Sequence, residues 1–253
     1  MSIRRLLKSK RTWLSILAVV IVSLVAFVVY ILVSLPDVSD LKTQNPETTA
    51  LMKMRIKQAE DKGTEYVIKQ DWVSFDHIPQ LFKDTVRIAE DFGFYWHKGI
   101  DYEELKEALK QSIRKRRFVR GASTITQQLA KNLYLSTEKS IFRKIKEYLI
   151  ARRMEKTLTK DRIFELYLNV IELGPGVFGI QAASQHFFGI SINELTLEDM
   201  VRLTAVLPRP LRTDPRGNSP WIRWRCRWLL HKLKLYEYIT EEAYQETVEL
   251  FVE

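Results

Sequence analysis

Residues 89–99, AEDFGFYWHKG, combine two features that proteins usually keep apart. Glu90 and Asp91 are adjacent carboxylates, which normally lie in water, whereas the aromatic residues that follow them are normally shielded from it. A partly desolvated setting, with the aromatics and His97 as its wall, increases the affinity of a carboxylate for protons. The stretch therefore predicts a site with two candidate carboxylates, Glu90 and Asp91, in a setting that favours proton uptake.

The chain on either side of this stretch has mostly helical patterning. Apolar residues recur at about four-residue intervals over 105–113 and again over 141–149. Segment 66–75, YVIKQDWVSF, is rich in β-branched and aromatic residues and predicts one short strand. The expected fold class is mainly α, with little sheet.

Cap residues mark three helix starts in the last quarter of the chain. Thr196 and Asp199 have the spacing of a capping box, and Pro208 closes the segment that they open. Ser219 precedes a proline at the first helical position, and Thr240 precedes two glutamates. We therefore expect helices to begin after residues 196, 219 and 240.

The helix expected after Ser219 carries a stripe of tryptophans. Trp221, Trp224 and Trp228 are spaced i, i+3 and i+7, which is most typical of a buried face. The surrounding arginines leave a second interpretation, in which a basic, Trp-rich surface rests on a membrane. We expect the tryptophans to lie in the core, and some of the arginines to contact lipid headgroups.

The N-terminal region predicts a membrane anchor. Leu14 to Leu35 contains 22 residues without a charge, and no acidic residue occurs in 1–35, whereas five basic residues precede the apolar run. About 20 apolar residues suffice to cross a bilayer as a helix. A cleaved signal peptide is the alternative, but VSLPDVSDL offers no A-x-A-like cleavage site.

The positive flank is expected to stay in the cytoplasm, with everything after Leu35 on the other side of the membrane. The expected organisation is a cytoplasmic basic N-terminus (1–13), a single transmembrane helix (14–35), a connector with a helical stretch (36–65) and an extracytoplasmic domain (66–253).

Cysteine and histidine usage predicts no metal site. Cys226 is the single cysteine, so neither an internal disulfide nor a thiol-based zinc site is expected, and a packing role is the more common one. The four histidines lack ligand spacing. Carboxylates remain compatible with a divalent cation such as Mg²⁺. No nucleic-acid partner is expected.

A second informative stretch is RGASTITQQLAKNLYL, residues 120–135. Thr124 and Gln127 have capping-box spacing, which predicts a helix opening just after Gly121. Hydroxyls, amides and the free N–H groups of a helix N-terminus suit a ligand with sugar hydroxyls or phosphate. A well-capped surface helix explains this stretch equally well.

The third stretch, FRKIKEYLIARRMEKTLTK at 142–160, places Arg143 and Lys144 on one helix face with Glu147. Alone, these residues predict surface ion pairs of about 0–1 kcal/mol. Together with Glu90 they provide two carboxylates and several cations, a set that suits transfer at a sugar carbon. Lys131 adds a further cation, which favours a diphosphate leaving group and glycosyl transfer over simple hydrolysis.

Five ordered motifs between residues 90 and 189 resemble the signatures of the peptidoglycan glycosyltransferases, whose catalytic domain is lysozyme-like. The matching residues are Glu90-Asp91-x-x-Phe94-x-x-His97-x-Gly99, then Gly121-x-Ser123-Thr124-Ile125-Thr126-Gln127-Gln128 with Lys131-Asn132, then Arg143-Lys144-x-x-Glu147 with Ala151 and Glu155, then Lys160 with Ile163-Phe164-Glu165-x-Tyr167-Leu168-Asn169, and finally Gly174, Gly176, Gly179, Ala182, Ala183 and Phe188-Gly189.

The resemblance implies an inverting enzyme that polymerises lipid II into β-1,4-linked glycan strands, with undecaprenyl diphosphate as the leaving group. By matching position, Glu90 would be the base and Glu147 would assist near the donor. The substrate-binding residues implied by the same match are Asp91, His97, Ser123, Thr124, Gln127, Gln128, Lys131, Asn132, Arg143 and Lys144.

The resemblance also implies which partners the protein has, and two rival functions stay open beside the one that it implies. The expected partners are lipid II, the nascent glycan strand and membrane lipid, with room for other cell-wall synthesis proteins; no organic cofactor is implied. Because only 64 residues follow Gly189, a monofunctional enzyme is expected. The rivals are a lytic enzyme of related fold that cuts glycan and a non-catalytic, membrane-anchored cell-wall binding protein.

Overall fold

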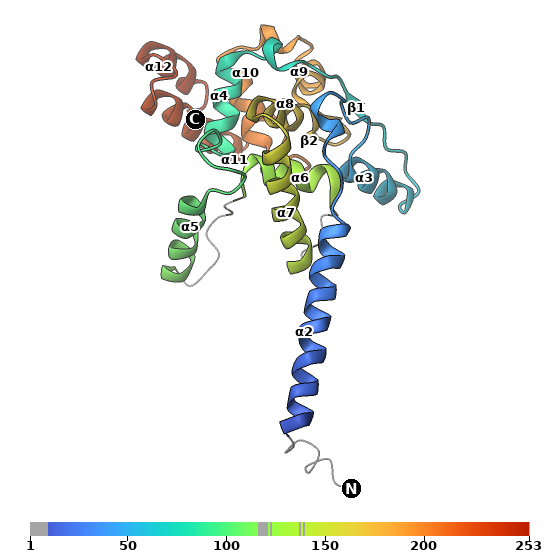
Figure 1. Cartoon of the computed structure of the whole chain (residues 1–253). Coiled ribbons are helices and arrows are strands. Elements are labelled where there is room, and N and C mark those ends of the chain that lie inside the picture. The colour runs from blue at the N-terminus through green and yellow to red at the C-terminus, as the bar shows by residue number, and fades with distance from the viewer. Residues whose placement is uncertain (1–9, 116–120, 122, 137, 139, 253) are drawn as a thin grey trace. The chain divides into compact units, whose positions relative to one another are not determined.

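A computed structural model describes residues 10–115, 121, 123–136, 138 and 140–252. Most of the predicted basic N-terminus, residues 1–9, lies outside the described residues. The elements in chain order (Figure 1) are α2 (Lys10–Val33), η1 (Asp40–Lys42), α3 (Ala50–Glu60), β1 (Lys69–Gln70), η2 (Phe75–His77), α4 (Gln80–Glu90), α5 (Tyr102–Arg114), α6 (Ile125–Tyr134), α7 (Ile141–Thr157), α8 (Lys160–Val170), β2 (Glu172–Gly174), β3 (Val177–Phe178), α9 (Ile180–Phe188), η3 (Ile192–Glu194), α10 (Leu197–Val206), α11 (Pro220–Leu235) and α12 (Glu241–Glu249).

The first of two compact units covers residues 1–37 and consists mainly of α2. Within α2, Thr12–Val33 is long and apolar enough to cross a membrane. The expected N-terminal apolar helix is thus present, although a signal sequence satisfies the same criterion. The predicted boundaries of the span, 14 and 35, stay a prediction.

The second unit covers residues 38–253 and includes α3. Thr49 caps α3 by accepting a hydrogen bond from the Met52 N–H. Leu51 and Met52 pack against Phe178 in one apolar cluster. The guanidinium of Arg55 donates from Nε and Nη2 to the two oxygens of Glu172, at 2.8 and 2.7 Å. The helical stretch of the expected connector therefore packs within the second unit.

A small sheet has the strand order β1-β3-β2, with β1 parallel and β2 antiparallel to β3. The strand predicted in 66–75 is present as β1, two residues long. The β2–β3 hairpin was not predicted. At its turn, Gly176 has φ +74°, and a Cβ there would meet the Val67 carbonyl oxygen at 2.4 Å, so the backbones approach too closely for any side chain.

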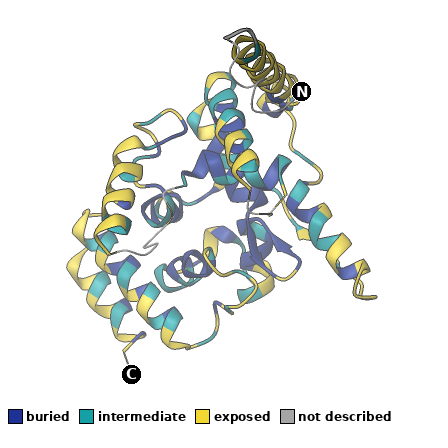
Figure 2. Ribbon diagram, turned by 90° about the horizontal axis from the view of Figure 1, so that it is seen from below, coloured by how far each residue is buried: buried dark blue, intermediate teal, exposed yellow. Residues whose placement is uncertain are grey.

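The core of the second unit is helical, as predicted. Helix α6 packs against α3, α7 and α8, while α10 packs against α4 and α11. The buried positions gather on the inward faces of these helices, and the exposed positions lie along their outer turns (Figure 2). Phe82, Leu129 and Phe164 are among the most deeply buried side chains. Helices α4, α10 and α11 thus form one packed group, and α3, α7 and α8 surround α6.

The predicted helix starts are confirmed. Thr124 and Thr196 each form a complete capping box, with Gln127 and Asp199 respectively. Ser219 accepts a hydrogen bond from the Ile222 N–H in the first turn of α11. Thr240 accepts one from the Ala243 N–H in the first turn of α12. These starts depend on contacts within one helical turn, which makes them readable from sequence.

The tryptophan stripe of α11 is not the core face, so our expectation for it was wrong. Trp224 is 49% exposed, and Trp221 and Trp228 are only partly covered. The buried face of α11 is a neighbouring stripe of Ile222, Cys226, Leu229, Leu230 and Leu233. Cys226 has the packing role expected for it, and burial raises the pKa of its thiol to about 12.

Candidate active site

Glu90 is the last residue of α4, and its side chain is mostly buried, with 13% exposed. Gln128 Nε2, on α6, donates to Glu90 Oε2 at 3.0 Å. Arg225 Nη2, on α11, lies 3.8 Å from Glu90 Oε1. Burial raises the pKa of Glu90, while the Gln128 hydrogen bond and the charges of Arg225 and Lys131 partly oppose that rise. The direction agrees with a carboxylate that can take up a proton.

The amide of Gln128 has a defined orientation. Tyr167, on α8, is fully buried, and its hydroxyl donates to Gln128 Oε1 at 3.3 Å. The amide oxygen must face that donor, which directs the NH₂ group toward Glu90. Tyr167 thus orients Gln128, and Gln128 in turn holds one oxygen of the Glu90 carboxylate.

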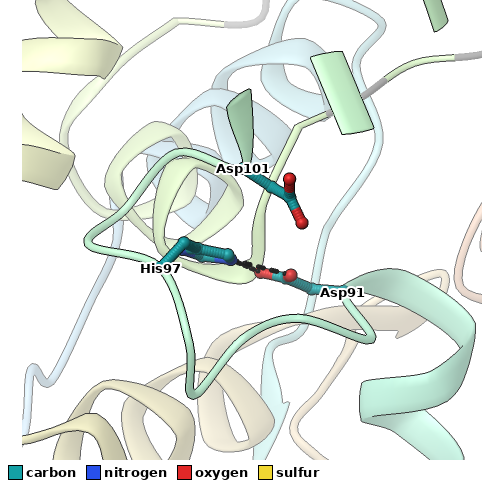
Figure 3. Close-up of side chains that lie close together, drawn as sticks. All are labelled: Asp91, His97 and Asp101. Atoms are coloured by element: carbon teal, nitrogen blue, oxygen red, sulfur yellow. Dashed lines mark hydrogen bonds and ion pairs between the residues drawn. The ribbon is translucent and has the colours of Figure 1, made fainter. Parts of the chain in front are cut away.

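Asp91 and His97 form a second hydrogen-bonded group, shown in Figure 3. The Gly99 N–H donates to His97 Nδ1 at 3.2 Å, so Nδ1 acts as an acceptor. His97 Nε2 then carries the hydrogen and donates to Asp91, 2.9 Å from Oδ1. Asp91 Oδ2 also accepts from the Ile125 N–H at 2.9 Å, in the first turn of α6. The pair joins the aromatic loop to α6; its contact with substrate stays a prediction.

Asp91, His97 and Asp101 offer ligand atoms within 4.8 Å of one another, close enough to hold a cation together (Figure 3). Both oxygens of Asp91 already accept hydrogen bonds, and the His97 nitrogen that faces them is a donor. Asp101 Oδ1 accepts the Glu104 N–H as the N-cap of α5. The contacts of the trio fit a hydrogen-bonded loop better than a set of free ligands for Mg²⁺.

Helix α6 and the residues just before it carry several polar side chains that are buried or partly buried. Thr124 and Gln127 are hydrogen-bonded to each other in the capping box, and the Thr124 hydroxyl also donates to the Gly99 carbonyl at 2.8 Å. Asn132 is 7% exposed. Ser123, just before the cap, accepts from Lys144 Nζ at 2.9 Å. Direct binding of sugars by these four residues stays a prediction.

Glu147, on α7, lies inside a group of cations. Its side chain is 3% exposed, and its two oxygens accept from Arg143 Nη1 and Lys144 Nζ, both at 2.5 Å. Lys131, on α6, lies near this group. Burial lowers the pKa of Lys131, and the charges of Arg143 and Lys144 lower it further, whereas the charge of Glu147 raises it. Three cations and one carboxylate leave a formal charge of +2, which suits a dianionic ligand.

A cavity of about 370 Å³ opens beside Glu90. Its lining includes Ser123 and Thr124, which the sequence suggested as substrate-binding residues, and Phe92 and Trp96 of the aromatic loop. Trp228, Lys232 and Tyr236 also line it, and the sequence had not placed these three at the site. The Phe92 ring stacks on Tyr236 with 4.5 Å between centroids. Trp228 and Lys232 lie on α11 and Tyr236 is its C-cap, each four residues after the one before, on the face that also carries Arg225. This spacing was the signal in the sequence that could have grouped them.

Comparison with known proteins identifies the family to which this chain belongs. The profile of the family described as Transglycosylase matches residues 57–234. The biosynthetic peptidoglycan transglycosylase of Nitrosospira multiformis is 38% identical over 189 residues, which cover 75% of this chain and 82% of that protein. The protein of the same name from Alcanivorax borkumensis is 40% identical over 201 residues, 79% of each chain.

Among solved structures, penicillin-binding protein 1A from Haemophilus influenzae superposes with a TM-score of 0.42, at 20% identity over 73% of this chain and 18% of that one. The family assignment is based on the sequence matches instead, because each covers more than two thirds of the chain. By these matches, the chain belongs to the transglycosylase family, among the biosynthetic peptidoglycan transglycosylases.

Proposed function

We propose that this chain polymerises lipid II, joining its disaccharide-peptide units into β-1,4-linked glycan strands of peptidoglycan. The observation that carries the proposal is the pairing of a buried carboxylate of raised pKa, Glu90, with a cluster of net charge +2 around Glu147. The first group suits proton removal from a sugar hydroxyl, and the second suits a diphosphate.

In the proposed step, the 4-hydroxyl oxygen of the acceptor attacks C1 of the donor sugar. The bond between C1 and the diphosphate oxygen breaks, and its electron pair leaves with undecaprenyl diphosphate. Glu90 takes the hydroxyl proton, while Lys131, Arg143 and Lys144 stabilise the charge that develops on the leaving group. Attack opposite the leaving group inverts C1, which gives the β linkage.

The cation cluster disfavours the lytic rival. Cleavage of a finished glycan strand releases a sugar hydroxyl, which needs a proton from an acid rather than positive charge. Here Glu147 is held by Arg143 and Lys144 and acts as the anion of an ion-paired cluster. The non-catalytic rival gives no reason for Glu90 to be buried and oriented by Gln128.

The location that we propose follows from the apolar helix and the substrate. A lipid-linked substrate requires an enzyme held at a membrane, and α2 is long and apolar enough to serve as its anchor. We place the N-terminus in the cytoplasm and the catalytic domain outside the inner membrane, in a single-pass, monofunctional enzyme. Partners would be lipid II, the nascent strand, membrane lipid and other cell-wall synthesis proteins.

The test is polymerisation of labelled lipid II by the purified full chain in detergent. We expect glycan polymer from the wild type and none from Glu90→Gln. The matched control is Glu198→Gln, which removes a carboxylate of α10 that pairs with Arg202 and should leave polymerisation intact. Release of soluble fragments from finished glycan, without polymer from lipid II, would refute the proposal.

A further inference from the structure

A second hollow, of about 520 Å³, lies on the catalytic domain next to the aromatic loop. It is lined by Tyr95, Trp96, His97, Lys98, Arg152, Glu155, Lys156, Leu158 and Lys160. We call it the 95–160 groove. Trp96 lines both this groove and the cavity beside Glu90, so the two hollows meet at one side chain.

The floor of the groove is built from ion-paired residues. Glu155 Oε1 accepts from Thr126 Oγ1, on α6, and from Lys160 Nζ at 2.8 Å. Lys160 Nζ also lies 4.3 Å from the centroid of the buried Phe94 ring. At Gly99, with φ +86°, a Cβ would come within 3.1 Å of Glu155 Cγ, so the loop sits directly on α7. The ion pair with Glu155 compensates the charge of Lys160.

Three cations of the groove have no carboxylate partner among the described residues: Lys98, Arg152 and Lys156. Arg152 Nη1 donates to the Lys98 carbonyl at 3.0 Å, which fixes the guanidinium at the rim. Trp96 is 75% exposed, an unusual state for the largest apolar side chain. The groove thus offers a flat aromatic face beside a formal charge of +3.

We propose that the 95–160 groove binds the peptide-bearing glycan strand beyond the sugars that react. This inference depends on the proposed function, and it names a further part of the substrate site. The apolar face of a pyranose ring stacks on Trp96, while carboxylates of the stem peptides pair with Lys98, Arg152 and Lys156. An anionic lipid surface is the alternative occupant, because tryptophan and cations also suit a membrane interface. The strand is favoured because the groove shares Trp96 with the cavity beside Glu90.

The first test measures binding of soluble, peptide-bearing glycan oligomers to the full chain in detergent. We expect Lys98→Glu/Lys156→Glu to weaken binding at least about tenfold at low salt, and the wild-type affinity to fall as salt rises. Lys57→Glu/Lys62→Glu, on and just after α3, makes the same charge change on exposed positions far along the sequence and should not alter binding. Unfolding temperatures check that both variants are folded.

The second arm compares aromatic variants and ligands. Trp96→Ala should weaken glycan binding, whereas Trp224→Ala, which removes another exposed tryptophan, should not. Glycan stripped of its peptides should bind less tightly than the peptide-bearing form. With lipid II as substrate, Lys98→Glu/Lys156→Glu should give shorter strands than the Lys57→Glu/Lys62→Glu control.

Equal glycan affinity in the wild type and Lys98→Glu/Lys156→Glu would overturn the inference, as would equal binding of peptide-free and peptide-bearing glycan. Binding of anionic vesicles through Lys98 and Lys156, without glycan binding, would overturn it in favour of lipid. Failure of the wild type to polymerise lipid II would refute the proposed function instead. The two failures are distinct, because binding is measured on ready-made oligomers.

Discussion

Replacing Arg225 by glutamine should move the pH dependence of polymerisation. Arg225 contributes a positive charge 3.8 Å from Glu90 Oε1 and opposes the effect of burial on the pKa of that carboxyl. A base works only when ionised, so the rate falls as the pH drops through the pKa of Glu90. Without the positive charge that pKa rises, and the acid limb of the pH–rate profile moves to higher pH.

The size of the shift follows from the geometry. Two unit charges at about 4 Å attract by about 4 kcal/mol at an effective dielectric constant of about 20. That value is a ceiling, because Arg225 and Glu90 keep 12% and 13% of their side chains exposed. We expect the lower end of the usual range for a neighbouring opposite charge, about 1 pH unit. At pH values where Glu90 is mostly protonated, the rate of Arg225→Gln would then be about tenfold lower than that of the wild type.

The assay is the initial rate of lipid II polymerisation between about pH 5.5 and 9, at saturating substrate. Arg225→Lys should restore much of the wild-type profile, because it keeps the charge. Arg227→Gln makes the same charge change two residues away, where the guanidinium donates to the Phe251 carbonyl, and should leave the limb in place. An acid limb in Arg225→Gln that coincides with the wild-type limb would refute the reasoning.

Three further predictions concern the site and its scaffold. Asp91→Asn should lower the free energy of unfolding by about 1.5–3 kcal/mol, measured in urea, because it removes a charged hydrogen-bond acceptor; an unchanged midpoint would contradict this role. Gly176→Ala should cost well over the 1–2 kcal/mol of a left-handed alanine, since its Cβ would meet the Val67 carbonyl, whereas Gly63→Ala, with nothing within 4 Å, should cost about that amount alone. Lys144→Ala should reduce turnover strongly while thermal unfolding hardly moves, because its side chain is 47% exposed; an unchanged rate would make it a mere ion-pair partner.

Local signals in the sequence predicted much of the fold. A capping box such as Thr124 with Gln127 depends on atoms three residues apart, so it forms wherever the helix forms. The same holds for the ion pairs of Glu147 with Arg143 and Lys144, one turn apart on α7. These predictions needed no knowledge of the tertiary structure.

Long-range contacts could not be predicted in the same way. Arg225 meets Glu90 only because α11 packs on α4, and nothing near either residue indicates that packing. The tryptophan stripe shows a related limit. Helix α11 carries two apolar stripes, and periodicity cannot say which one faces the core. The face with Ile222 and Leu229 does so, and it leaves Trp228 in the lining of the cavity beside Glu90.

The burial of Cys226 has a practical consequence for following this enzyme at work. It is the only thiol in the chain, and with a pKa of about 12 it carries almost no thiolate at neutral pH. Thiol reagents are attacked by the thiolate, so the native chain should be nearly inert to them. A cysteine introduced at an exposed position such as Lys98 would then be the single labelled site. A fluorophore or spin label there would report the arrival of glycan without any prior removal of native cysteines.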